Sequence, residues 1–497
     1  MLKRGISLLL TTALLCGLLA SPAAAADTGG AIDRSQALDK LSAYDQVFTD
    51  MGSTSKDSMP IGNGSMASNV WVEENGDLVL YLSRSDAYSE ATRLLKVGRV
   101  RVSARYEDGS NVFSTGTAFE QKLVLEEGAV YITAGEGDKE VSFKLWIDGD
   151  YDVLELEASA ASPITLTVTN DLWRTETLTM DKSGGNNRSF IGVHINYGDE
   201  LPTESADVVA DRTGENQLLW YHRNETSLYE KMVSYQKLDQ EITDYYTKYP
   251  DPYLHNTFGA LIEGAGFTAS DTKTLTTAEA GTDFDLHIYT HCAQTDTAEE
   301  WEQQLEERKA AAKVAGKDSR WDAHTAWWRD VWTRSWIFIT GDATAEAVTQ
   351  GYILQRYQVA CMGGADEAIH FNGGLFTMCT NESQGDDYRD WGSMYWHQNT
   401  RLVYWPMLAA GDYEFMKAYF DMYLDALPLR KEISTEFFGK EGAYYPEQMY
   451  AYGADGTRDK LQWAIDGTGD YTTYHWQNGF EVVQMMLDYY DMTGDET

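Results

Sequence analysis

The stretch KLVLEEGAVYITAGEGDKEVSFKLWI, residues 122–147, carries the pattern that decides the fold of the N-terminal half. Three short runs rich in Val, Ile, Leu, Phe and Tyr alternate with polar positions, and acidic, glycine-containing segments separate them. Such runs are typical of half-buried strands joined by tight turns. Similar runs fill residues 60–175 and continue to Cys292. Because short strands that follow one another without helices favour antiparallel pairing, we predict an N-terminal antiparallel β-sandwich.

The pattern changes near residue 296. TAEEWEQQLEERKAAAKVAG and the following RWDAHTAWWRDVWTR concentrate strong helix formers, which predicts a helical linker. Further on, apolar residues recur at helical spacing, and aromatic or glycine-rich loops separate the segments. We therefore divide the chain into a β-sandwich domain at 32–293, a helical linker at 294–341 and a helical domain at 342–497.

The N-terminus has the features of an export signal. Lys3 and Arg4 precede an apolar run from Ile6 to Leu19, and four alanines occupy 23–26. This order is typical of a signal peptide, residues 1–26, with cleavage near Ala26. The apolar run is shorter than the roughly 20 residues that span a bilayer. We therefore predict a secreted protein that has no membrane contact after cleavage.

Composition narrows the classes of partner. Acidic side chains outnumber basic ones by 78 to 39, which gives a net charge of −39. Nucleic-acid binding requires basic patches that neutralise phosphates, so we do not expect a nucleic-acid partner. The chain also has 31 Tyr and 15 Trp, whose rings combine flat apolar faces with polar tips. Such rings suit hydrated ligand sites, although most of them are expected to lie in cores.

Polar and aromatic residues are interleaved in the helical domain. If a helix ran through the longest such segment, Trp391 and Tyr395 would lie one turn apart, and Pro406 would end or kink it. A purely structural alternative is a Trp-rich packing helix whose polar groups are satisfied by a neighbour. The four segments are HFNGGLFTMCTN (370–381), DDYRDWGSMYWHQNTRLVYWPML (386–408), AYYPEQMY (443–450) and HWQNGFE (475–481).

This mixture of residues suits sugars. Their C–H faces pack on aromatic rings, and their hydroxyls need directional hydrogen-bonding partners. Cleavage of a glycosidic bond typically takes two carboxyl groups, one of which protonates the departing oxygen. Glu447 follows Pro446 and stands among Tyr444, Tyr445 and Tyr450. Such apolar neighbours favour the neutral carboxyl form that a general acid needs.

In order and approximate spacing over about 60–480, these segments resemble glycoside hydrolase family 95, the α-L-fucosidases and their relatives, or a sister family. Members have a β-sandwich, a helical linker and an (α/α)6 barrel, and the resemblance implies this architecture here. MPIGNGSMASNVW (59–71) and LYLSRSDAYSE (80–90) are similar to the family's LPIGNGRLGAMV opening and LNEDTLW continuation, FNGGLFT (371–377) to its LQGIWN loop, HQNTRLVYWP (397–406) to its NINxQMNYWP helix, and YYPEQ (444–448) to its YSPEH turn.

The resemblance implies roles for individual residues. Glu447 matches the general acid, and Asn399 matches one of two asparagines that hold the attacking water. His397 replaces the other asparagine, and an imidazole can titrate near neutrality. Arg401 and Val403 also depart from the pattern, so α-L-fucose is not assumed as the substrate. Substrate-binding side chains are predicted at Asn372, Trp391, Trp396, Arg401 and Trp476.

The catalytic base is a separate problem. The family uses a distant Asp, and an (α/α)6 barrel has twelve helices, whereas residues 344–497 accommodate about five or six. We therefore expect a partial barrel with exposed apolar faces and weak activity, and a base beyond Thr497. Asp466, Asp470 and Glu481 are the candidates within the chain.

Together these observations predict a secreted glycoside hydrolase, inverting at the anomeric carbon, that acts on an oligosaccharide or polysaccharide. The mechanism requires neither a metal nor a cofactor. Two alternatives remain open: a non-catalytic carbohydrate-binding protein on the same scaffold, and a related glycoside phosphorylase.

Overall fold

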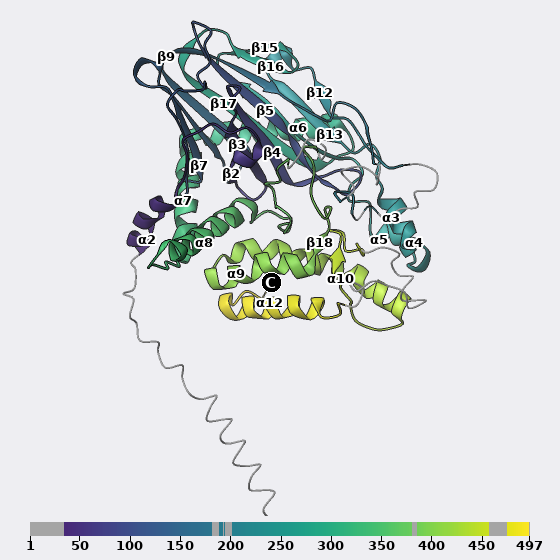
Figure 1. The fold of residues 1–497 in the computed structure, drawn as a ribbon. Coiled ribbons are helices and arrows are strands. Elements are labelled where there is room, and N and C mark those ends of the chain that lie inside the picture. The colour runs from purple at the N-terminus through teal and green to yellow at the C-terminus, as the bar shows by residue number, and fades with distance from the viewer. Residues whose placement is uncertain are drawn as a thin grey trace, which may run out of the picture.

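The computed structural model describes residues 34–180, 188–191, 193, 201–379, 385–456 and 475–496. The predicted signal peptide at 1–26 lies outside these residues. An N-terminal antiparallel β-sandwich is followed by linker helices and a helical C-terminal part, which confirms the predicted fold class. Figure 1 shows the sandwich in the upper half and the helices below it. Within the described residues, no helix combines the length and apolar character that crossing a membrane requires.

One long strand joins the two layers of the sandwich. The first half of β9 (Val153–Asn170) pairs with β8 (Val141–Ile147) and β17 (Gly281–Gln294). Its second half pairs with β5 (Leu94–Tyr106) and β16 (Thr274–Thr277). The other described strands that precede the linker helices are β1 (Gln46–Phe48), β2 (Met59–Gly62), β3 (Met66–Val72), β4 (Asp77–Tyr88), β6 (Phe119–Val124), β7 (Ala129–Ala134), β10 (Leu178–Thr179), β11 (Thr203–Glu204), β12 (Val208–Ala210), β13 (Leu218–Arg223), β14 (Asn256–Gly264) and β15 (Phe267–Asp271).

The stretch 122–147 forms β6, β7 and β8, as its pattern predicts. Ile132 lies opposite Phe143 across the β7–β8 pair, and both side chains are buried, whereas their strand neighbours are only partly buried. Full burial of one such side chain stabilises the fold by about 1.5–3 kcal/mol. At the β6–β7 turn, Gly128 has a positive φ of 57°, and a Cβ there would lie 2.0 Å from Nε1 of Trp328. This glycine therefore lets a linker tryptophan pack against the sandwich.

Two linker helices run along the sandwich. Helix α6 (Ala298–Ala315) packs on β17 with buried Trp301 and Leu305, and Thr297 caps it by accepting the N–H of Glu300. Helix α7 (Lys317–Arg334) buries Trp328 and Trp332. These aromatic contacts fix the sandwich against the helices that follow.

An insertion between β13 and β14 carries three short helices that the sequence did not predict: α3 (Tyr229–Tyr235), α4 (Leu238–Glu241) and α5 (Tyr245–Lys248). The ring of Tyr229 packs edge-on against Tyr452 at 4.9 Å. Gln236 donates from its amide to the carbonyl of Asp455 at 2.7 Å. The insertion therefore supports the loop that follows Glu447.

The helical part contains α8 (Ala343–Met362), α9 (His397–Ala410), α10 (Lys417–Phe438) and α12 (Asn478–Thr493), and α12 lies alongside α9 in Figure 1. Of the two outcomes predicted at Pro406, an end or a kink of the helix, the first is wrong, because α9 continues through this residue. Pro406 lies on the exposed face of the helix, where the backbone carbonyl that loses its N–H partner can be hydrated. The helix ends instead at Gly411, which takes the left-handed conformation.

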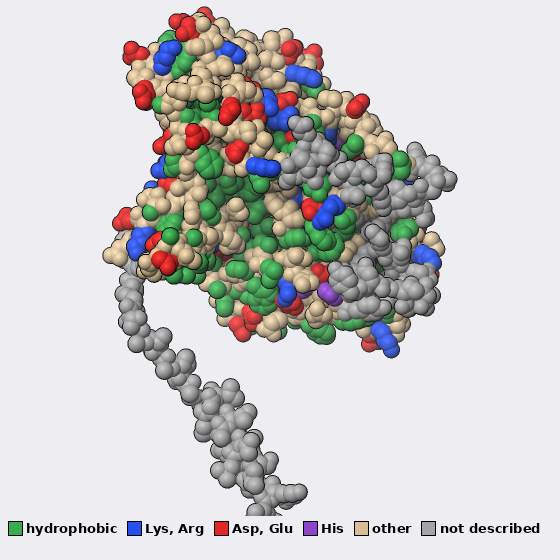
Figure 2. Space-filling model, in the orientation of Figure 1, with side chains coloured by type: hydrophobic (Ala, Val, Ile, Leu, Met, Phe, Trp, Pro, Cys, Tyr) green, Lys and Arg blue, Asp and Glu red, His purple; other side chains and the backbone are tan. Residues whose placement is uncertain are grey.

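The outer faces of α10 and α12 expose apolar side chains, as expected for a helical domain of this size. Leu424, Val483 and Leu487 are all exposed, and Phe480 is 80% exposed. Figure 2 shows hydrophobic side chains gathered over the lower, helical part of this face. A shorter helix near the N-terminus, α2 (Arg34–Leu41), packs on the linker helix α7.

Candidate functional site

A two-stranded ladder places Glu447 at the start of α9. Strand β18 (Tyr395–Trp396) pairs with β19 (Gln448–Met449), with Trp396 opposite Gln448. The backbone N–H of His397 donates to the carbonyl oxygen of Glu447 at 2.8 Å. The N–H of Gln398 donates to Glu447 Oε1 at 2.9 Å. The side chain of Glu447 thus binds the first turn of α9, where the helix dipole favours negative charge.

Helix α12 completes the surroundings of this carboxyl group. Nδ1 of His475 lies 3.0 Å from Glu447 Oε2, and Nδ2 of Asn478 lies 3.5 Å from the same oxygen. Glu447 is 3% exposed. Its immediate partners are therefore the backbone N–H of Gln398, the side-chain amide of Asn478 and a ring nitrogen of His475. These polar groups correct the apolar setting that the neighbouring tyrosines predicted.

His397 lies beside Glu447 with its imidazole buried. Nδ1 is 3.1 Å from Tyr423 Oη and 3.2 Å from Tyr419 Oη, and Nε2 is 3.4 Å from Glu481 Oε2. Burial lowers the pKa of His397 to about 4, although the Glu481 carboxylate opposes this shift. The imidazole is therefore neutral at physiological pH, and the expected titration near neutrality is wrong.

Glu481 links His397 to two other side chains of α9. Arg401 Nη1 and Trp405 Nε1 both donate to Glu481 Oε1. Burial alone would raise the pKa of Glu481, but the hydrogen bonds from Arg401, Trp405 and His397 lower it below its usual range. Arg401, predicted to bind substrate, is thus held in an ion pair. Of the other two candidate bases, Asp466 and Asp470, neither lies within the described residues.

Asn399 does not join this cluster. Its side chain is exposed, and within the described part of the chain it makes no hydrogen bond to Glu447. The reason is helical geometry: residues at i and i+2 of one helix face different directions. His397 and Asn399 therefore do not point at a common water position, which corrects the predicted pairing.

Trp391 and Trp396 meet, but not on a helix. Trp391 has a φ of 72°, in the left-handed region, so the predicted one-turn spacing from Tyr395 is wrong. Its ring packs edge-on against Trp396 at 5.0 Å and is 39% exposed. The amide of Asn372 donates to the carbonyls of Asp390 and Gly392 at 2.7 and 2.8 Å. Asn372 therefore holds this turn in place.

Trp476 is half exposed and packs against Tyr444, with ring centres 4.9 Å apart. It lines an open groove of about 260 Å³ beside the cluster. One wall of the groove is Tyr423, whose hydroxyl contacts His397. The aromatic lining consists of Tyr423, Tyr445, Trp476 and Phe480. The rest of the lining is mostly aliphatic, and Glu447 does not belong to it. The tyrosine and tryptophan rings offer flat apolar faces with polar tips, which suit a sugar.

Sequence reasoning did not identify His475 and Asn478. Both lie in HWQNGFE, a stretch from which only Trp476 and Glu481 were singled out. The signal that could have found them is position: Asn478 is the first residue of α12, and His475 precedes it by less than one turn. Polar side chains at a helix start are free to turn toward a neighbouring loop.

Comparison with known proteins places the chain by family and by fold. The sequence model of the family described as "Domain of unknown function (DUF5703)" matches residues 47–337, which cover the sandwich and linker helices. No curated protein matches.

A solved structure from the human microbiome, assigned as a kojibiose phosphorylase, superposes with a TM-score of 0.54 at 10% identity. That match covers 92% of this chain and 57% of the other, so this chain spans little more than half of its length. A bacterial glucoamylase complexed with acarbose gives a TM-score of 0.34 at 10% identity, covering 83% of this chain and 56% of the other.

Proposed function

This chain belongs to the family defined by the domain of unknown function DUF5703, and we propose that it is a secreted enzyme that cleaves glycosidic bonds. The observation that carries the proposal is the buried carboxyl group of Glu447, which accepts hydrogen bonds at the N-termini of two helices. A groove with four aromatic rings adjoins this cluster through Tyr423, whose hydroxyl contacts His397. The similar fold of an enzyme assigned as a kojibiose phosphorylase supports a carbohydrate substrate. The N-terminal sequence supports export.

In this proposal Glu447 is the general acid that protonates the departing glycosidic oxygen, so it must take up a proton although the N–H donors around it favour its carboxylate form. Gln398 and Asn478 orient the carboxyl group through N–H donors, and His475 contacts the same oxygen as Asn478. Trp476 and Tyr445 provide the rings on which the sugar packs. Orientation of this kind lowers the barrier because the proton donor is already positioned when the bond breaks.

The reaction that we propose is hydrolysis with inversion, as the resemblance to the α-L-fucosidase family implies. Inversion needs a second, ionised carboxylate on the opposite face of the sugar, about 6.5–9.5 Å from the acid. Glu481 is held ionised by its donors and contacts the imidazole of His397, whose backbone N–H donates to the carbonyl of Glu447. Among the described carboxylates, it is therefore the one that we propose for this role. α-L-Fucosides belong in the first substrate panel, although Arg401 and His397 depart from the family pattern.

The decisive experiment compares aryl glycosides whose leaving groups differ in basicity. Glu447→Gln should lose about 10²–10⁴-fold in kcat/KM on substrates with poor leaving groups and much less on nitrophenyl substrates, which need little protonation. Glu441→Gln, in an exposed position of the same loop, is the matched control and should keep full activity. An equal loss on both substrate classes would show that Glu447 only supports the fold.

A phosphorylase is the second candidate, favoured by the fold similarity to the enzyme assigned as a kojibiose phosphorylase. Phosphate attacks the sugar without a base on the protein, so a single catalytic carboxyl group would suffice. Phosphate-dependent release of a sugar 1-phosphate would establish this reaction, and release of free sugar independent of phosphate would establish hydrolysis. A chain that binds sugars but cleaves none would support the non-catalytic alternative.

A further inference from the structure

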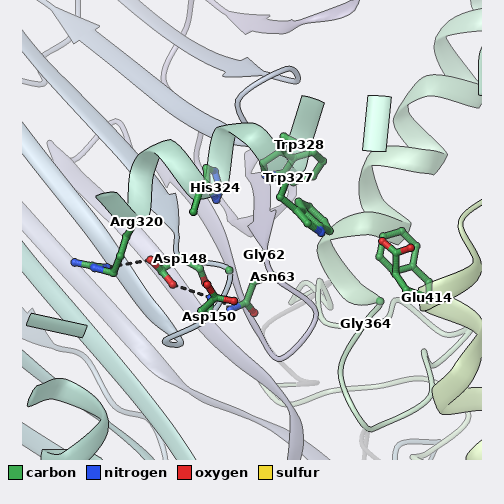
Figure 3. Close-up of a pocket in the computed structure, with 14 residues that line it drawn as sticks. Gly62, Asn63, Asp148, Asp150, Arg320, His324, Trp327, Trp328, Gly364 and Glu414 are labelled. Carbon is green, nitrogen blue, oxygen red and sulfur yellow. Dashed lines mark hydrogen bonds and ion pairs between the residues drawn. The ribbon is translucent and has the colours of Figure 1, made fainter. Parts of the chain in front are cut away.

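A cavity of about 400 Å³ lies where the sandwich, helix α7 and the first helices of the helical part meet (Figure 3). Its volume falls within the range of small-molecule sites. The sandwich contributes the loops at Gly62 and Asn63 and at Asp148–Asp150, and Glu414 comes from the turn before α10. None of its lining residues belongs to the Glu447 cluster. The cavity is therefore a separate feature of the molecule.

Close backbone approaches keep this cavity open. Gly64 has a φ of 95°, and a Cβ there would lie 2.2 Å from the carbonyl oxygen of Gly363. A Cβ on Gly363 would in turn lie 2.8 Å from the ring of Phe415. Glycines at these positions bring the sandwich loop against the end of α8 and leave backbone groups, not side chains, along the wall.

One wall of the cavity is aromatic. Trp327 is only partly buried and packs edge-on against the buried Trp328 with ring centres 5.0 Å apart. Phe415 lies 6.2 Å from Trp327 on the other side. In Figure 3 the indole of Trp327 stands between the α7 side and Glu414, facing the open space. A ligand entering here therefore meets the accessible surface of an indole held by two rings.

The polar groups of the cavity favour a neutral ligand. Asp148 is buried and pairs with Arg320 at 3.2 Å, and Glu155 also contacts Arg320, so this cation is neutralised. Among the described residues, Nε of Arg320 has no hydrogen-bond partner, although Arg320 is only 6% exposed. Asp150 and Glu414 add two carboxylates at the exposed rim. Anions are therefore disfavoured, whereas hydroxyl groups find acceptors on the rim.

We propose that this cavity is an accessory carbohydrate-binding site that takes one neutral sugar residue. The C–H face of the sugar packs on Trp327, and its hydroxyls donate to Asp150 and to backbone carbonyls at the glycine turns. The choice of a sugar over another neutral ligand rests on the proposed function. Because the site joins the sandwich to the helical part, an occupied site stabilises the folded chain against unfolding.

The test uses single monosaccharides as probes: D-glucose, D-galactose, L-fucose and L-arabinose. Binding is measured by titration calorimetry and by the rise in melting temperature. Ala323→Phe places a ring in the cavity from an exposed position of α7, so the chain should fold and binding should be lost. Ala311→Phe is the matched control on an exposed position of α6 and should bind normally. Asp150→Asn should weaken binding about tenfold, because a charged acceptor is lost.

Glu447→Gln separates this inference from the proposed function. The accessory site should bind the monosaccharide unchanged in that variant, whether or not catalysis is lost. If Ala323→Phe binds as well as the original chain, or if Glu447→Gln removes binding, the sugar occupies the other site and the inference fails. A melting-temperature rise with choline but with none of the four sugars would also overturn it, since the aromatic and acidic walls would then select an organic cation.

Discussion

Two buried histidines, one in each half of the molecule, differ in charge at physiological pH: one is protonated and the other is neutral. His222 in β13 lies 2.9 Å from Glu90 and 3.2 Å from Asp207. Burial would lower its pKa, but the two carboxylates raise it to about 9. His397 in the helical part has one carboxylate, Glu481, at 3.4 Å, and there burial prevails and lowers the pKa to about 4.

The difference lies in the number and burial of the carboxylates. Glu90 and Asp207 are themselves buried, so water screens neither of them, whereas Glu481 is partly exposed and shares its charge with other donors. The sandwich histidine is therefore a charged part of the fold. The helical one is a neutral group that can both donate and accept a hydrogen bond beside Glu447.

The largest effect should follow from removing the charged histidine. His222→Gln leaves the buried Glu90 without its cation, although Asp207 keeps its ion pair with Arg174, so the free energy of unfolding should fall by about 3–5 kcal/mol. Urea denaturation followed by circular dichroism measures this loss. His255→Asn, at a partly exposed left-handed position that asparagine tolerates, is the control and should change stability by less than about 1 kcal/mol. Similar losses in both variants would show that the buried ion pairs contribute little.

The two histidines should also give stability opposite dependence on pH. The folded pKa of His222, about 9, lies above its ordinary 6.5. Its contribution is therefore complete below pH 6.5 and is lost as pH rises to about 9. His397, with a folded pKa of about 4, resists protonation that the unfolded chain accepts. Stability should therefore fall as pH drops from 6.5 to 4, by up to about 3 kcal/mol.

Urea midpoints across the pH range measure these slopes. His222→Gln should flatten the profile only between pH 6.5 and 9, and His397→Gln only between pH 4 and 6.5. Each variant must be compared with the original chain, because His324 is also buried and its pKa is lowered to about 4. His324 therefore contributes to the same acid limb as His397. If His397→Gln left the acid limb unchanged, the imidazole would be charged in the folded protein.

The sequence predicted the sandwich well because the alternating pattern of a strand is contained in its own consecutive residues. In β7 and β8 the alternation of buried and partly buried positions follows directly from residues such as Ile132 and Phe143. The site was harder, since its parts come from separate segments. Glu447 and His397 were recognised from their motifs, but the β18–β19 ladder that brings them together has only two residues in each strand and leaves no periodic signal.

Errors in the site arose where local pattern was extended too far. A helix that ran through Trp391 was considered, yet that residue is left-handed and helical structure begins at His397. Treating Asn399 as a partner of His397 ignored the rotation between neighbouring positions of a helix. Conversely, His475 meets Glu447 through a contact between loops far apart in sequence, which a single sequence does not reveal.

The smallest effect should come from the exposed counterpart of the sandwich ion pairs. Arg401→Gln removes a donor from Glu481 at a place where both side chains are partly exposed. The free energy of unfolding should therefore fall by only about 0.2–1 kcal/mol. Arg93→Gln breaks an ion pair with Glu204 in which both side chains are buried, so the free energy of unfolding should fall by about 3–5 kcal/mol.

Arg401→Gln should also raise the pKa of Glu481, because one of its three donors is gone. If Glu481 is the catalytic base, the acid limb of the pH–rate profile then moves to higher pH while stability hardly changes. A large loss of stability from Arg401→Gln would show instead that this pair supports the fold as its buried counterparts do.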